Sequence, residues 1–163
     1  MTVDVFFSHE RVLAVPFATA AARLARLPRG GWFREMSEAV YQDGVEHLMR
    51  VGPAGAMPGA SRLVRVWFTE PVHRDGTMAI GLRWEATGVT GGLFPALDAD
   101  IRLTGDGEGA RLTLTGSYRP PFGALGAGLD RLLLRTVATA TLRTLLARVA
   151  AALEDVPAVS HRS

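Results

Sequence analysis

Four charged side chains gather in residues 82–103, which read LRWEATGVTGGLFPALDADIRL. Arg83 and Glu85 form an Arg-x-Glu pair, and Asp98 and Asp100 form an Asp-x-Asp pair. Carboxylates at this spacing can ligate a divalent cation or act as a general acid and a general base. The same charges can instead line the solvent face of a sheet, where opposite charges on neighbouring strands stabilise the pairing.

The apolar residues between these charges favour the solvent-facing interpretation. Side chains of a strand alternate between its two faces, so the apolar and charged positions must point in opposite directions. A metal site would have two ligands from Asp-x-Asp and no histidine nearby in the sequence. A glycosidase-like carboxylate pair would lack a cleft on an outward sheet face. We therefore predict that Leu82, Trp84, Ala99 and Ile101 face inward and that the charge ladder faces solvent: Arg83, Glu85, Asp98 and Asp100.

The histidines do not form a metal-binding pattern. Neither His-x-His nor His-x-x-x-His spacing occurs among them, so no zinc site is predicted; they are His9, His47, His73 and His161. Ser8-His9-Glu10 contains the residue types of a catalytic triad. However, neighbours in a strand point to opposite faces, so Ser8 and His9 cannot easily meet. His47 lies near a Gly/Pro/Ala loop and is a candidate for lining a pocket, against an ordinary surface or core position.

The composition excludes several classes of chemistry. The 163 residues include no cysteine and no lysine. Disulfides, thiolate nucleophiles, cysteine metal sites, Schiff bases and the lysine of a P-loop are therefore absent. The glycines of GALGAGLD do not match GxGxxG, and no strand-helix-strand unit surrounds them. We expect no cofactor and no metal.

Charge and hydropathy bear on the partners and the compartment. The formal net charge is +2, and the arginines are spread along the chain without interleaved aromatics, so we expect no nucleic-acid partner. The segment FGALGAGLDRLLLRTVATATL is interrupted by Asp130, Arg131 and Arg135, so we expect no membrane span. MTVDVFFSHE lacks the features of a secretory signal, so we expect a cytoplasmic protein.

The pattern of elements predicts one α+β domain over residues 1–163, with a flexible tail from about residue 155. Alternating apolar residues predict antiparallel strands, and helical spacing predicts helices. Arg74-Asp75-Gly76 predicts a tight hairpin turn between two of the strands. In chain order we expect a strand over Val3–Val15, two short helices beginning at Pro16 and Trp32, a strand over Val45–Val51, a loop at 52–61, strands near 63–72, 78–86, 97–104 and 111–119, and a long helix from Gly123 to Leu153.

The long C-terminal helix carries two apolar stripes, which helical geometry places on nearly opposite sides. The first runs Leu125, Leu129, Leu132, Leu133, Val137 and Ala140. The second runs Leu142, Leu145, Leu146, Val149 and Leu153. One straight helix cannot bury both against one sheet. We therefore predict a bend or bulge between Ala138 and Thr141, or a second burial partner such as another copy in a homodimer.

This order of elements, with RVGPAGAMPGASRLVRV, LRWEATGVTGGLFPALDADIRL and GSYRPPFGALGAGLDR, resembles the START-like SRPBCC superfamily. More narrowly, it is similar to bacterial members described as polyketide cyclase/dehydrase-like. The resemblance covers nearly the whole chain. It implies a helix-grip fold, in which a curved antiparallel sheet wraps around a long helix with an apolar cavity between them. It also implies a small hydrophobic ligand, such as a lipid or polyketide, and in some members an enzymatic activity.

Three functions follow as hypotheses. The first is binding or carriage of a small hydrophobic molecule, and the second is a cyclase, aromatase or dehydratase acting on a polyketide-like substrate. The third is an interaction protein whose cavity is filled by its own side chains. No motif ties the chain to a catalytic branch. The expected ligand-binding residues are Tyr41, His47, Ile80, Leu82, Trp84, Ala99, Ile101, Leu112, Leu114, Tyr118, Leu129, Leu132 and Thr136.

Overall fold

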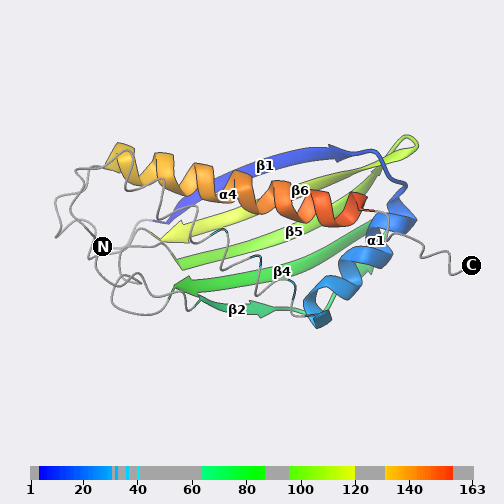
Figure 1. The fold of residues 1–163 in the computed structure, drawn as a ribbon, viewed down its shortest axis with the longest axis horizontal. Helices are drawn as coiled ribbons and strands as arrows, with labels where there is room; N and C mark the ends of the chain where they lie inside the picture. The colour runs from blue at the N-terminus through cyan, green and yellow to red at the C-terminus, as the bar shows by residue number, and fades with distance from the viewer. Residues whose placement is uncertain are drawn as a thin grey trace, which may run out of the picture.

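The computed structural model describes residues 4–30, 64–86, 96–119 and 131–155, together with Trp32, Met36 and Val40. Within these residues the chain forms strands, two α-helices and a short 3₁₀ helix (Figure 1). In chain order they are β1 (Val5–Leu13), α1 (Phe17–Arg26), the 3₁₀ helix η1 (Leu27–Gly30), β2 (Val64–Phe68), β3 (Val72–Arg74), β4 (Thr77–Ala86), β5 (Ala96–Asp106), β6 (Gly109–Arg119) and α4 (Arg131–Glu154). This is the α+β class that the sequence predicts.

The strands form one six-stranded sheet in the order β1-β6-β5-β4-β2, and β3 also pairs with β4. Every pairing is antiparallel. β3 and β4 are joined by the predicted tight turn, in which Asp75 and Gly76 have positive φ angles of 49° and 72°. Aspartate and glycine tolerate this left-handed conformation, which explains why Asp-Gly marks the hairpin in the sequence. β5 and β6 are joined by a second turn around Gly107, which has φ 60°.

One face of the sheet, here called the inner face, is continuously apolar. The alternation predicted for β4, β5 and β6 is confirmed, because the large apolar residues at the described inward positions are buried and their neighbours along the strands are more exposed. Burying these large side chains stabilises the fold by about 1.5–3 kcal/mol each before entropy costs. The inner residues, all at most 6 % exposed, are Leu13, Met78, Ile80, Leu82, Trp84, Leu97, Ala99, Ile101, Leu103, Ala110, Leu112, Leu114 and Tyr118.

Both α-helices lie on this inner face (Figure 1). α1 buries Ala20, Ala21 and Leu24, and contacts β5, β6 and α4. α4 lies along β1 and also contacts β6. The end of α4 is held to α1 and to the β1–α1 connection. Arg23 of α1 donates to the carbonyl oxygen of Leu153 over 2.5 Å, and the Ala14 N–H in the connection donates to the Glu154 carboxylate over 3.0 Å. These bonds satisfy a carbonyl that would otherwise lack a helical partner.

The predicted second stripe of α4 faces the core. It consists of buried residues at helical spacing, and it extends back by one turn to Ala138. α4 passes through Ala138–Thr141 without interruption, so the helix contains no bulge at the predicted place. Leu125 and Leu129 of the first stripe lie outside the described residues, as do the side chains of Leu132, Leu133 and Val137. A second burial partner for the first stripe therefore stays a prediction.

Several predicted boundaries change in the structure. The strand predicted near 63–72 is two strands, because the pairing with β4 is interrupted after Phe68 and resumes at Val72. The strand predicted to reach Val15 ends at Leu13. In the second predicted short helix, Trp32, Met36 and Val40 are helical, and Met36 and Val40 are buried. The predicted strand at 45–51, the loop at 52–61 and the helix start at 123–130 lie outside the described residues.

Candidate functional site

The charge ladder lies on the outer face of the sheet, as predicted. Arg83, Glu85, Asp98 and Asp100 are exposed, while the apolar residues between them are buried. Arg83 lies directly opposite Asp98 in the pairing of β4 with β5, and their charged groups are 3.6 Å apart. The surrounding water screens this pair, so its contribution to stability is at most about 1 kcal/mol. These residues are not positioned as a buried acid and base.

Two small residues lie side by side on the inner face of the sheet. Ala99 of β5 and Gly116 of β6 are register partners, and Gly116 is also the register partner of Phe7 on β1. The two small residues lie between larger ones, because Leu82 is the other neighbour of Ala99 and Leu114 and Tyr118 flank Gly116 along β6. At Gly116 atoms of β5 already occupy the place of a Cβ atom, so the two residues add little bulk above the sheet. A helix or a ligand must fill the space above them.

An aromatic cluster borders these two small residues on the β1 side. The ring of Phe7 is 6.0 Å from that of His9 and 6.4 Å from that of Tyr118, measured between centroids. Phe7 and His9 share the inner face of β1, whereas Ser8 is exposed on the outer face. The Ser-His-Glu sequence therefore cannot act as a triad, as its position in a strand predicts. α4 covers this side of the sheet, and its cations Arg135 and Arg143 act on the cluster electrostatically.

Burial shifts the pKa values of the two ionisable groups of this cluster in opposite directions. Burial, assisted by the positive charge of Arg143, lowers the pKa of His9 below its ordinary value of 6.5. Burial also raises the pKa of Tyr118 above its ordinary value of 10.0, although Arg135 opposes this change. Both groups are therefore neutral at pH 7. Tyr118 offers a hydroxyl donor, and His9 offers one donor and one acceptor nitrogen.

The shifted pKa of His9 predicts a pH dependence of stability. Its folded-state pKa is lower than its unfolded-state pKa, so on acidification the unfolded state takes up the proton first. The contribution of His9 to the free energy of unfolding is therefore fully present above about pH 6.5. It is lost as the pH falls through the lowered pKa of the folded state. In urea denaturation between neutral and mildly acidic pH, we expect His9→Asn to lose less stability on acidification than the wild type. Arg143→Gln should show an intermediate slope, and equal slopes in wild type and His9→Asn would contradict the assignment.

The structure brings together many, but not all, of the predicted ligand-binding residues. Those of the sheet are all buried on the inner face, where they form one apolar wall; they are Ile80, Leu82, Trp84, Ala99, Ile101, Leu112, Leu114 and Tyr118. Thr136 is exposed on α4. Tyr41, His47 and Leu129 lie outside the described residues, as does the side chain of Leu132. The cavity predicted beside this wall stays a prediction.

Sequence reasoning missed the aromatic cluster in which Phe7 lies next to both His9 and Tyr118. The sequence did contain a signal for this cluster. The strand alternation that places Ser8 and His9 on opposite faces also places Val5, Phe7 and His9 on one face. The pairing of β1 with β6 was not evident, since the residues of each pair lie about 100 positions apart. In that pairing Val5 faces Tyr118, and Phe7 faces Gly116.

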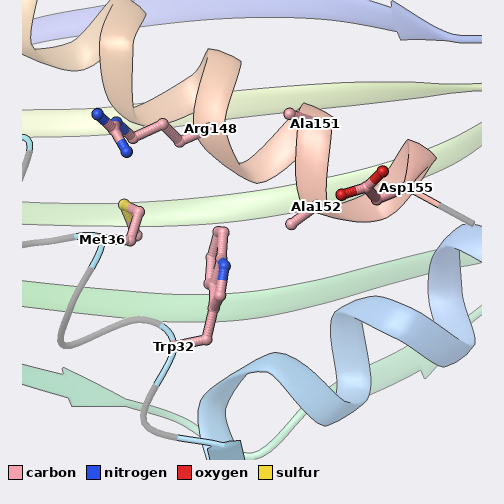
Figure 2. Close-up of a pocket in the computed structure, with 6 residues that line it drawn as sticks. All are labelled: Trp32, Met36, Arg148, Ala151, Ala152 and Asp155. Atoms are coloured by element: carbon pink, nitrogen blue, oxygen red, sulfur yellow. The ribbon is translucent and has the colours of Figure 1, made fainter. Parts of the chain in front are cut away.

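A separate groove lies at the C-terminal end of α4. Its volume is about 320 Å³, and Figure 2 shows Trp32 below the helix with Arg148 and Asp155 toward opposite ends. Met36, Ala151 and Ala152 complete the lining. The small alanines leave the helix surface accessible above the indole ring. The groove presents one cation and one anion at its ends, but its described lining includes no histidine and no hydroxyl group.

Three further results concern metal ligands, membrane spans and similarity to known proteins. Among the described residues, no group of three or more His, Asp or Glu side chains is placed to hold a metal ion. None of the helices in the described part of the chain is long and apolar enough to cross a membrane. In comparisons with known proteins, no family model matches the chain and no curated protein matches it significantly.

Proposed function

We propose that the protein binds or carries a small hydrophobic molecule between the inner face of the sheet and the first half of α4. The observation that carries the proposal is the pair of small residues, Ala99 and Gly116, within a wall of large apolar side chains. A close-packed core fills such positions from the opposite side. The first half of α4 also carries small residues between Thr136 and Ala140, which agrees with a space on this side of the sheet.

The chemistry of the wall supports a mainly apolar ligand. Ile80, Leu82, Trp84 and Ile101 present no charge, and Tyr118 provides a polar tip at the border. A ligand against this wall would gain about 25 cal/mol per Å² of buried apolar surface, less the costs of ordering and association. One neutral hydroxyl donor at the edge suits a carbonyl or hydroxyl group of the ligand. The resemblance to START-like proteins agrees with a lipid or polyketide.

The second candidate is an enzyme of cyclase, aromatase or dehydratase type. It is favoured by the position of His9 and Tyr118 on the inner face, where their rings lie on either side of the Phe7 ring. A neutral imidazole can accept a proton, and the Tyr118 hydroxyl can donate a hydrogen bond to a carbonyl oxygen. Turnover of a polyketide-like substrate that is lost in both His9→Asn and Tyr118→Phe would distinguish this enzyme from a carrier.

The proposal is tested by filling the proposed space above Ala99. We expect the wild type to bind Nile red, a neutral hydrophobic dye, and Ala99→Phe to bind it about ten-fold or more weakly because the added ring occupies the site. The measurement is the change in dye fluorescence during titration. Native mass spectrometry of gently purified protein would also reveal a co-purified molecule.

Ala110→Phe is the matched control for this test. Ala110 is also buried on the inner face, but it pairs with Leu13 and Gly105 at the opposite end of the sheet. Both substitutions add the same side chain to a packed position, so a shared loss of stability cancels in the comparison. If the wild type binds no dye, or if Ala99→Phe binds as well as the wild type, the carrier function is wrong at this site and an interaction protein becomes the better hypothesis.

A further inference from the structure

The outer face of the sheet contains a groove of about 710 Å³ on the opposite side from the proposed hydrophobic site. It extends over β2, β4 and β5, which lie side by side in Figure 1. Its volume is in the range typical of small-molecule sites. Its lining includes the charge ladder and consists of Arg65, Trp67, Phe68, Thr69, Gly81, Leu82, Arg83, Glu85, Asp98 and Asp100.

A bulge between β2 and β3 shapes this groove. Phe68 pairs with Leu82 and Val72 pairs with Ala79, so three residues (69–71) lie opposite two (80–81). Thr69 closes the interruption, because its hydroxyl accepts from the Gly81 N–H over 2.8 Å and its own N–H donates to the Gly81 carbonyl over 3.0 Å. The Thr69 side chain occupies the place where a Cβ atom of Gly81 would lie. The hollow of the groove lies beside these residues and Asp100, the register partner of Gly81 on β5. Bulges often occur where a sheet forms a functional site.

Trp67 provides an aromatic surface at the side of this hollow. Its side chain is 46 % exposed, although large apolar side chains are usually buried. Its register partner is Arg83, so Trp67 lies on β2 directly beside the charge ladder. Stacking on an exposed indole favours a ligand with a flat apolar face.

The charges around Trp67 select among ligand classes. The groove has two guanidinium groups, Arg65 and Arg83, and three carboxylates, Glu85, Asp98 and Asp100. An anion would meet the carboxylates, and a cation would meet the guanidinium groups. A hydrophobic molecule would leave these polar groups without water. A neutral ligand with many hydroxyl groups can use both signs, since hydroxyls donate to carboxylates and accept from guanidinium groups.

We infer that this outer groove binds a neutral saccharide, with one sugar ring stacked on Trp67 and its hydroxyl groups bonded to the surrounding carboxylates and guanidinium groups. The C–H face of a pyranose ring matches the indole, and its equatorial hydroxyls point sideways toward Arg83 and Asp100. This site is independent of the proposed hydrophobic cavity, because the sheet separates them.

The test is an NMR titration of the ¹⁵N-labelled protein with four neutral trisaccharides, namely maltotriose, cellotriose, xylotriose and N,N′,N″-triacetylchitotriose. We expect at least one to shift the Trp67 indole and Gly81 amide signals, and Trp67→Ala to weaken its binding about ten-fold or more. Phe6→Ala removes another exposed aromatic ring, on the distant edge strand β1, and should leave binding unchanged. Ala99→Phe should also leave it unchanged, which separates this site from the hydrophobic cavity.

The neutrality of the ligand is tested with salt and with Asp100→Asn. A neutral saccharide should bind equally well at low and high salt, because screening acts on charged partners. Asp100→Asn retains an acceptor oxygen and should weaken binding much less than Trp67→Ala. The inference is overturned if no trisaccharide shifts the Trp67 signal, if Trp67→Ala binds normally, or if binding falls steeply with salt and so reveals an ionic ligand.

Discussion

Leu145→Ala is expected to destabilise the protein by about 2–5 kcal/mol, the usual cost of removing most of a buried leucine side chain. Leu145 is 1 % exposed and lies in the middle of the α4 stripe that faces the core. The loss combines the transfer energy of the missing carbons with the cavity that remains. The measurement is the midpoint of urea denaturation, followed by circular dichroism.

Arg148→Ala is the matched control, because Arg148 lies one turn further along α4 and is exposed. Both substitutions introduce alanine, which has a high helix propensity. The two variants therefore differ mainly in the burial of the side chain that is removed. We expect Arg148→Ala to change stability by no more than about 0.5 kcal/mol. Similar midpoints for the two variants would show that the second stripe does not anchor α4 to the sheet.

Gly116→Ala is expected to destabilise the protein by about 3 kcal/mol, at the upper end for added atoms in a packed region. A Cβ atom at Gly116 would clash with the carbonyl oxygen of Asp98 and would lie 2.6 Å from Cα of Ala99. Both are backbone atoms of the paired strand, so they cannot move without shifting β5. For a protein of this size the change corresponds to a fall in Tm of roughly 6–12 °C.

Gly105→Ala is the control for this prediction. Gly105 also lies in a strand of the same sheet, but the nearest atom to an added Cβ is the Cβ of Phe17 at 3.9 Å, an ordinary contact. This variant should be nearly neutral, since it adds a methyl group in open space and reduces the freedom of the unfolded chain. Equal thermal stability of the two variants would show that β5 and β6 do not approach closely at Gly116.

The sequence alone determined the class of the fold, the faces of the strands and the position of the tight turn. These features are local: alternation has a period of two, and Asp-Gly adopts the turn conformation wherever it joins two strands. The outward direction of Arg83 and Asp98 was predictable for this reason. The inward direction of Leu82 and Ala99 followed from the same alternation.

Only the tertiary structure decided which of these residues meet. The contact of Phe7 with Tyr118 and the influence of Arg143 on His9 join segments more than 100 positions apart, and they depend on the register of β1 with β6. The hollow beside Trp67 likewise depends on an extra residue in the β2–β3 connection, which no local pattern reveals. Periodicity specifies the face of a side chain, whereas its neighbours across the sheet are set by strand register and by the packing of α4, which are properties of the whole fold.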